Sequence, residues 1–248
     1  MIKGFYNLTS GMLSQGNRLD VIANNMTNVA TAGYKSDSYT DTTFKEYMLN
    51  RVGNKDKSNP SQLGTASYIL APDKIYTDFT QGTMEQTGLP LDFGISGDGF
   101  FAVQTPEGTA YTRAGSFALD NEGYLCLTRA GRVLDQNGNT IYLGTDKIQA
   151  DTNGTITSDD GTVLGKLGVF ALGDTQQLQR SAQGLFTGGT PQASNATVMW
   201  KYVERANVDL MKQMTGMISA QRAFQSAAEV SKMYDELMTK AATNLGNV

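Results

Sequence analysis

The first thirty residues of the chain repeat apolar side chains at alternating spacings of three and four. Asn, Ser, Arg and Asp side chains occupy many of the positions between them. This heptad pattern predicts an amphipathic helix from about Ile2 to about Asn28, where Asn, Thr and Gly residues favour a helix end. An apolar stripe of this length requires a partner, because it is not stable alone in water. The stripe consists of Phe5, Leu8, Met12, Gln15, Leu19, Ile22, Met26 and Val29, of which only Gln15 is polar.

The last forty residues carry a second and wider apolar stripe. No Pro interrupts the stretch from about Ala206 to Leu245, which predicts one long helix. The stripe drifts around the helix, as expected for a helix that contacts more than one neighbour. We therefore predict that both terminal helices pack as a coiled coil and also form the interface between subunits. The interface residues predicted in this second helix are Leu210, Met214, Met217, Ile218, Gln221, Phe224, Tyr234 and Leu237.

Methionine is concentrated in this second helix. Met is flexible and polarizable, and it repacks easily against different surfaces. Two interpretations remain open: an ordinary coiled-coil core, or adaptable packing among several subunits. The residues concerned are Met211, Met214, Met217, Met233 and Met238.

The middle of the chain is typical of a β domain. From Leu91 to about Thr187, short apolar or alternating runs are separated by Gly-containing turn signals, which predicts antiparallel hairpins and meanders. Residues 36–75 are polar and predict an irregular connecting arm with some strand. The fold class is therefore α+β. The expected divisions are 1–33 for the N-terminal helix of an axial core domain, 34–90 for the arm, 91–198 for the β domain and 199–248 for the C-terminal helix of the core domain.

Composition excludes several function classes. The net charge is −4 and the pI is about 4.9, with the acidic excess between residues 36 and 200, which argues against binding to nucleic-acid phosphates. The chain has no His and one Cys, so it has neither a Cys/His zinc site nor a His-dependent triad. Cys126 lies in an apolar run and is predicted to be a small core residue. No apolar run has the length of a membrane span, and no signal-peptide pattern begins the sequence.

Candidate catalytic and binding motifs are weak. The glycine-rich segment 94–101 lacks the Lys-Ser/Thr of a phosphate-binding loop, and segment 135–140 departs from a calcium loop at its sixth position. The acidic pairs Asp159-Asp160 and Asp120 with Glu122 stand at predicted turns. Trp200 is predicted to be a packing anchor. We identify no catalytic residue, no cofactor site and no metal site.

Three segments, in order, resemble the signatures of flagellar rod and hook proteins. The first is "LDVIANNMTNVATAGYK", although Met26-Thr27 stands where the family often has Leu-Ala. The second is "DFGISGDGFFAVQTPEGTAYTRAGSFALDNEGYLCLTRAGRVL". The third begins "ERANVDLMKQMTGMISAQRAF", with Ala206 in place of the usual Ser and Lys212-Gln213 in place of a usual Glu pair. The signature residues are Asn24, Asn25, Asn28, Thr31, Gly33, Tyr34, Lys35, Asn207, Val208 and Arg222.

The resemblance best fits a proximal or distal rod protein and implies a structural subunit, not an enzyme. It implies that copies polymerise into a helical tube, which transmits torque from motor to hook. It also implies contacts with neighbouring rod and hook proteins, and export by the flagellar apparatus without a cleaved signal peptide. The alternative from sequence is an adhesin-like binding module with a coiled-coil stalk and a β head. That alternative predicts a stable dimer or trimer in solution instead of a polymer.

Overall fold

The computed structural model describes residues 2–51, 61–173, 178–181, 183–194 and 196–245. Helices at both ends of the chain and antiparallel sheets between them confirm the α+β class. The chain forms two compact units. Unit 1 comprises Met1–Met26, Asp37–Tyr76 and Asp209–Val248, and unit 2 comprises Thr27–Ser36 and Thr77–Val208.

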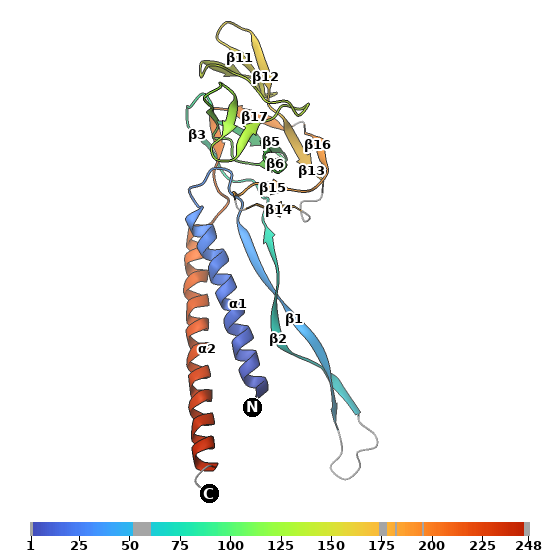
Figure 1. Cartoon of the computed structure of the whole chain (residues 1–248), viewed down its shortest axis with the longest axis vertical. Coiled ribbons are helices and arrows are strands. Elements are labelled where there is room, and N and C mark those ends of the chain that lie inside the picture. Colours follow the sequence, from blue (N-terminus) through green and yellow to red (C-terminus); the bar gives the residue numbers. More distant parts are fainter. Residues whose placement is uncertain (1, 52–60, 174–177, 182, 195, 246–248) are drawn as a thin grey trace. The chain divides into compact units, whose positions relative to one another are not determined.

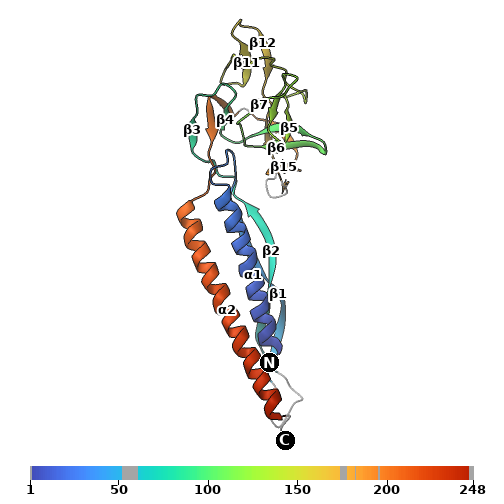
Figure 2. The same cartoon turned by 60° about the vertical axis from the view of Figure 1, so that its left-hand side comes forward.

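Unit 1 contains the helices α1 (Ile2–Thr27) and α2 (Leu210–Leu245), which lie side by side and antiparallel (Figures 1 and 2). Gly4 lies against Tyr234, and Gly216 lies against Ile22, so small residues occur where the helices approach. Both helices begin and end close to the predicted residues. Coiled-coil packing between them is not confirmed and stays a prediction. Neither helix has a described stretch that is long and apolar enough to cross a membrane.

Capping explains where α2 begins. The Asp209 carboxylate accepts a hydrogen bond of 3.1 Å from the backbone N–H of Lys212, the third residue of the helix. An Asp at this position satisfies an N–H that has no partner within the helix, which is the usual stabilising role of an N-cap. The helix therefore starts one residue after a side chain that fixes its first turn.

The expected irregular arm is not confirmed, because unit 1 contains two long strands in this part of the chain. They are β1 (Asp37–Arg51) and β2 (Ser61–Thr77), which pair with each other. The Ser38 hydroxyl donates to the Tyr76 carbonyl, and the Thr40 hydroxyl donates to the Lys74 carbonyl. Residues 37–44 are rich in Thr and aromatic side chains, which favour strands. This propensity outweighs the polarity that suggested an irregular arm.

Unit 2 is built from short antiparallel strands. The largest sheet has the order β14-β15-β6-β5-β9-β8-β7, with β13 beside β5 and β16 beside β13. Its members are β5 (Phe100–Thr105), β6 (Gly108–Thr112), β7 (Ala118–Leu119), β8 (Leu125–Leu127), β9 (Gly131–Val133), β13 (Val169–Leu172), β14 (Gln179–Arg180), β15 (Phe186–Thr187) and β16 (Pro191–Ala193). In the central pair, Phe101 lies opposite Thr112 and Val103 opposite Ala110.

Smaller sheets complete unit 2. One has the order β10-β11-β12, from β10 (Ile148–Ala150), β11 (Thr155–Ser158) and β12 (Val163–Lys166). A second pairs β4 (Phe93–Ser96) with β17 (Thr197–Trp200). A third pairs β3 (Met84–Gln86) with β18 (Tyr202–Glu204). The segment before α2 therefore enters the sheets of unit 2 through β17 and β18.

One turn type recurs between the strands of unit 2. The residue three positions after the first is a Gly with positive φ, and its N–H donates to the carbonyl of the first residue. The N–H of the first residue donates in turn to the carbonyl of the residue four positions further on. This geometry is a type I turn followed by a bulge, in which Gly adopts the left-handed conformation without steric cost. The turns begin at Asp120, Asp135, Asp151 and Ser158, and their glycines are Gly123, Gly138, Gly154 and Gly161. The acidic and Asn-Gly segments noted in the sequence are therefore hairpin turns.

Aromatic and aliphatic side chains fill the core of unit 2. Phe93, Phe101 and Phe117 pack together, with ring centroids 5.2–6.1 Å apart. A second cluster groups Phe100 with Phe186. Cys126 is only half-buried, so the prediction that it is a buried core residue is wrong. It occupies an outer strand, β8, where its neighbour Leu125 takes the inward position.

Candidate functional site: a buried ion cluster and an exposed helix face

The three segments that carry the resemblance meet inside unit 2 around a buried ion cluster, formed by Lys35, Arg113 and Glu204. The Lys35 ammonium lies 2.6 Å from Glu204 Oε1, and the Arg113 guanidinium lies 3.2 Å from Glu204 Oε2. All three side chains are almost fully buried. The cluster thus joins the segment that follows α1 to the strand that precedes α2.

Backbone groups hold each charged side chain in place. Lys35 also donates to the Thr80 carbonyl at 2.7 Å, and Arg113 donates to the Gly97 carbonyl at 2.7 Å. Glu204 Oε1, the oxygen next to Lys35, also accepts a hydrogen bond of 2.8 Å from the Gly82 N–H. Buried charges are tolerated only when paired and hydrogen-bonded in this way. Arg113 Nε is buried without a hydrogen-bond partner among the described residues.

The cluster contains two cations and one carboxylate. Burial lowers the pKa of Lys35, and the hydrogen bond and charge of Glu204 oppose this shift. Burial likewise lowers the pKa of Arg113, again against the attraction of Glu204. Glu204 is therefore the group on which both cations depend. Its loss would leave two buried positive charges without their counter-ion.

Gly33 occupies a position that only glycine fits. Its φ is +69°, and a Cβ atom there would lie 2.2 Å from the backbone nitrogen of Ala114. Its N–H donates to the Glu204 carbonyl at 2.7 Å. The backbone of this segment can therefore approach both β18 and the segment after β6, which brings Lys35 within reach of Glu204.

Two asparagines tie neighbouring chain segments together. In unit 2, Asn207 accepts from the Ser36 N–H at 2.7 Å and donates to the Asp78 carbonyl at 2.8 Å. In unit 1, Asn25 is buried, accepts from the Asp37 N–H at 2.9 Å and donates to the Asp37 carbonyl at 2.7 Å. One amide side chain offers both a donor and an acceptor, so it can accept from a backbone N–H and donate to a backbone carbonyl at the same time.

The other signature residues have more local surroundings. The Thr31 hydroxyl donates to the Asn28 side chain at 3.2 Å. The Tyr34 ring lies 4.2 Å from the Arg180 guanidinium carbon. Asn24 lines a cavity of about 340 Å³ within unit 1. Val208 is half-buried and Arg222 is exposed.

The predicted interface residues of α1 and α2 differ in exposure. In α1, Ile22 is buried and Leu8, Met12, Leu19 and Met26 are half-buried, whereas Phe5 is 47% exposed. Val29, which follows the helix, is also half-buried. In α2, Met217 and Tyr234 are half-buried, and Leu210, Met214, Ile218, Gln221, Phe224 and Leu237 are exposed. Most of the predicted stripe of α2 therefore faces water in the single subunit.

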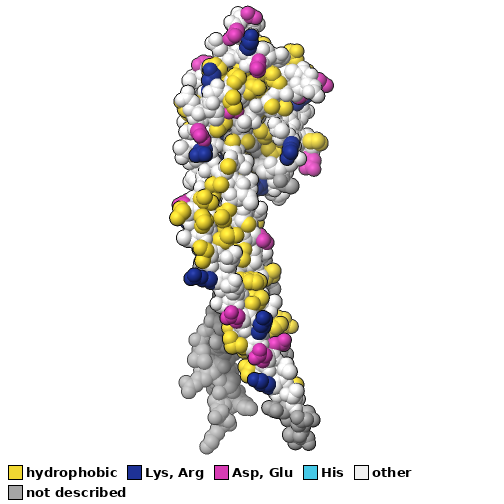
Figure 3. Space-filling view, turned by 90° about the vertical axis from the view of Figure 1, so that its left-hand side faces the viewer, with side chains coloured by type: hydrophobic (Ala, Val, Ile, Leu, Met, Phe, Trp, Pro, Cys, Tyr) yellow, Lys and Arg dark blue, Asp and Glu magenta, His cyan; other side chains and the backbone are white. Residues whose placement is uncertain are grey.

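The exposed apolar side chains of α2 form two patches. The Met211 patch is Met211, Met214 and Ile218, and the Met233 patch is Val230, Met233 and Leu237. Each follows an i, i+3, i+7 spacing, which places its members on one helix face. The Met211 patch is opposite to the side on which Gly216 and Tyr234 meet α1 and Ala220 is buried, and the Met233 patch lies between these two sides of the helix. Figure 3 shows hydrophobic side chains gathered over the beginning of α2, with charged side chains further along.

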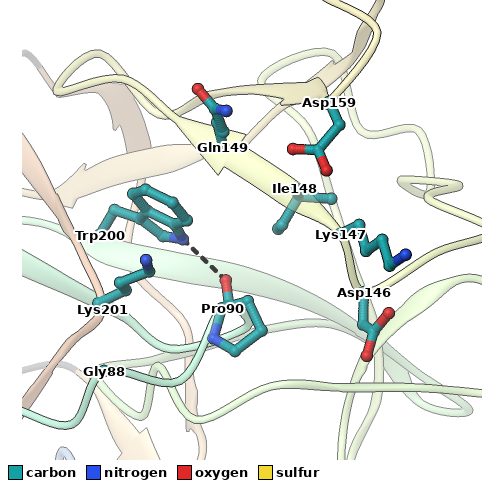
Figure 4. A pocket seen from close by; sticks show the side chains of 9 residues that line it. All are labelled: Gly88, Pro90, Asp146, Lys147, Ile148, Gln149, Asp159, Trp200 and Lys201. Carbon is teal, nitrogen blue, oxygen red and sulfur yellow. Dashed lines mark hydrogen bonds between the residues drawn. The ribbon is translucent and has the colours of Figure 1, made fainter.

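Unit 2 also has a surface cavity of about 490 Å³ beside Trp200 (Figure 4). The Trp200 indole N–H donates to the Pro90 carbonyl at 2.8 Å, and the Lys201 ammonium lies 4.0 Å from the indole ring centre. Trp200 is thus fixed in place, in agreement with its predicted packing role. Asp146 and Asp159 stand across from it. The described lining residues include no Ser, Thr, Cys or Tyr that could act as a nucleophile.

Sequence reasoning did not identify Arg113 or Glu204 as functional residues. Arg113 lies within the central segment of the resemblance, and Glu204 is the first residue of the last segment. From sequence alone, a charged residue in or beside a short strand is expected to be exposed to solvent. Lys35 was matched to the signature without a role. The sequence signal that could have indicated the ion cluster is Gly33, two residues before Lys35, because a glycine permits a close approach of the backbone to a neighbouring segment.

Comparisons with known proteins agree with this arrangement. Family descriptions match three segments: "Flagella basal body rod protein" at residues 5–35, "Flagellar hook protein FlgE/F/G D1 domain" at 94–185, and "Flagellar basal body rod FlgEFG protein C-terminal" at 201–245. These matches include Lys35, Arg113 and Glu204, one in each segment.

Relatives match along their whole length. The chain is 33% identical to the flagellar basal-body rod protein FlgG of Bacillus subtilis, over 96% of this chain and 97% of the relative. It is 30% identical to the rod protein FlgF of Mesorhizobium japonicum, over 100% and 99%. It is 28% identical to the flagellar hook-basal body complex protein FlhO of Bacillus subtilis, over 100% of both chains. The chain therefore belongs to the family of flagellar basal-body rod proteins, structural subunits of the flagellum.

Proposed function

We propose that this rod subunit polymerises through α1 and α2 into a helical tube that transmits torque from motor to hook. The observation that carries the proposal is the exposed apolar face of α2, in which Met211, Ile218 and Leu237 are at least half exposed. An apolar face of this extent on a soluble chain is typical of a surface that another chain covers. The role is mechanical, so we assign the chain no enzymatic activity.

The energetics favour association through this face. Burying an exposed Met, Leu, Ile or Val side chain contributes about 1.5–3 kcal/mol, so the six side chains of the two patches contribute on the order of 10 kcal/mol. Part of this gain offsets the lost freedom of the associating chains. In the proposed assembly, a different side of the neighbouring subunit covers this face, so that contacts repeat head to tail and extend into an open assembly.

The proposed partners follow from the family. They are further copies of this chain, neighbouring rod and hook proteins, and the flagellar export apparatus, with the basal body as the site of assembly. Coiled-coil packing of α1 and α2 with the helices of adjacent subunits forms the axial core domain. The adhesin-like alternative gains no support from the comparisons.

The buried ion cluster has a supporting role in this proposal. Force applied to the segment after α1 reaches unit 2 through the Lys35–Glu204 ion pair and the Gly33–Glu204 backbone hydrogen bond. Several parallel polar contacts in a dry environment resist separation better than one exposed pair. The cluster therefore joins the segments next to the assembly helices to the β domain.

Assembly of purified variants tests the proposal. We expect Phe224→Asp and Leu19→Asp to abolish polymers, because a carboxylate in an apolar contact must be desolvated without a partner. Unit 2 should keep its melting transition. The change Gln183→Asp, which adds the same charge at an exposed polar position of unit 2, serves as the control. Electron microscopy and sedimentation measure the polymer, and normal polymers from both apolar-site variants would contradict the proposal.

A further inference from the structure

We infer that the exposed methionines of α2 form an oxidation site that controls assembly of this subunit. The inference rests on the proposed function, because Met211, Met214 and Met233 belong to the two exposed patches of α2, and Met238 is exposed near the end of the same helix. Met211 is 70% exposed, Met214 45%, Met233 56% and Met238 46%. A thioether this accessible to solvent is open to attack by small oxidants before the subunit is covered by a neighbour.

The position of these side chains decides what their oxidation does. Met211 and Met214 supply two of the three members of the Met211 patch, and Met233 is the middle member of the Met233 patch. Along α2, polar residues separate the two patches, including Arg222, Gln225 and Glu229. Each apolar patch therefore depends on methionine for much of its apolar surface. Oxidation of the methionine sulfur atoms alone would therefore alter both patches.

The chemical step is a two-electron oxidation by hydrogen peroxide. The thioether sulfur attacks one peroxide oxygen, an S–O bond forms and the O–O bond breaks. The sulfur is oxidised to the sulfoxide, and the peroxide is reduced to one molecule of water. The product is a polar and chiral side chain in place of a flexible apolar one. A sulfoxide in the covered face would lose its hydration without gaining a designed partner, which opposes association.

The modification is reversible. Methionine sulfoxide reductases return each sulfoxide epimer to the thioether, with a dithiol as the reductant that becomes a disulfide and with release of water. Leucine has a similar volume and helix propensity but does not undergo this reaction. Methionine at these positions therefore gives the face a reversible sensitivity that leucine would not give.

The chain supplies internal controls. Met84 is half-buried, and its methyl group packs against the backbone of Gly94 in unit 2. It should react more slowly than the α2 methionines. Cys126 is half-buried, and burial raises the pKa of its thiol, which keeps it largely protonated. A Cys126→Ser background removes any remaining contribution from thiol oxidation.

The experiment uses the full chain in that background, treated with hydrogen peroxide and mapped by peptide mass spectrometry. We expect oxidation of Met211, Met214, Met233 and Met238 ahead of Met84. The critical concentration for polymer formation should rise at least about tenfold, and treatment with both reductases and a dithiol should restore it. A variant with all four of these methionines replaced by Leu should have the same critical concentration before and after peroxide treatment.

Two results would overturn the inference: normal assembly of the oxidised chain, or equal peroxide sensitivity of the Leu variant. Failure of the untreated chain to assemble at all would reject the proposed function and the inference with it. Normal assembly of the oxidised chain would reject only the inference. The melting transition of unit 2 should not move on treatment, since a general loss of fold would also raise the critical concentration.

Discussion

Unit 2 and α2 use apolar side chains in opposite ways. In unit 2, Phe93, Phe101 and Leu125 have no exposed surface, and they pack in one cluster drawn from many short strands. In α2, Met211 and Leu237 leave most of their side chains in water. The comparison teaches that the two regions satisfy their apolar side chains differently. Unit 2 completes its core within one subunit, whereas α2 leaves apolar surface exposed, as the proposed assembly requires.

The largest expected effect comes from the ion cluster of unit 2. Glu204→Ala leaves Lys35 and Arg113 buried without a counter-ion, so we expect unit 2 to lose about 3–5 kcal/mol of unfolding free energy. Urea unfolding followed by Trp200 fluorescence measures this loss.

The matched control is Glu85→Ala, on the strand paired with that of Glu204. Glu85 forms an exposed ion pair with Arg205, at 2.9 Å, and such pairs contribute about 0–1 kcal/mol. Similar losses in the two variants would show that the ion cluster does not stabilise unit 2 as its burial indicates.

The same substitution in the two regions tests the comparison directly. Leu125→Ala removes a side chain with 0% exposure, so we expect a loss of about 2–5 kcal/mol in the stability of unit 2. Leu237→Ala removes one that is 65% exposed, so the single subunit should change by less than about 0.5 kcal/mol. Chemical denaturation of dilute, unassembled protein measures both. The comparison would break if Leu237→Ala destabilised the single subunit as much as Leu125→Ala.

The smallest expected effect concerns a turn of unit 2. Burial opposes ionisation of Asp135, but the N–H groups of Asn139 and Asn137 donate to its carboxylate and lower its pKa below the ordinary 3.8. A lowered folded-state pKa gives stability that is present above the unfolded-state value and is lost as the pH falls through the folded-state value.

Asp135→Asn supplies the reference, because Asn also forms this turn and does not titrate. We expect the stability difference between wild type and variant to shrink on acidification from about pH 6 to about pH 2, since the carboxylate titrates in that range. Urea titrations at several pH values measure it. A difference that stays constant with pH would show that this carboxylate does not contribute through its charge.

The helices and the β class were predictable because their signals are local. The heptad spacing of α1 and the absence of Pro in α2 set their extents, and the Asn-Gly and Asp-Gly pairs marked hairpins. The sequence predicted some strand in the arm but not the length of β1 and β2, because many polar residues in this segment hide its strand propensity. Cys126 was misplaced because an apolar run does not reveal which of its residues faces the core.

The site was predictable only in part. The resemblance to flagellar rod and hook proteins singled out Gly33, Lys35 and Asn207, but the sequence did not show which residues they contact. Glu204 was not singled out, since its burial depends on Lys35, a residue far away along the chain. Helical periodicity predicted an apolar stripe on α2, and of its residues Met214, Ile218 and Leu237 belong to the exposed patches. What periodicity could not decide was which of two faces meets α1, and small residues such as Gly216 and Ala220 decide this in the structure.

The Lys35–Glu204 contact also constrains the timing of folding, because it spans 169 positions of the chain. A ribosome that adds about 5–20 residues per second needs roughly 10–30 seconds to produce Glu204 after Lys35. During that interval the nascent β domain lacks its final strand, and Lys35, joined later by Arg113, has no contact with Glu204. The ion cluster can therefore form only after most of the chain has been synthesised.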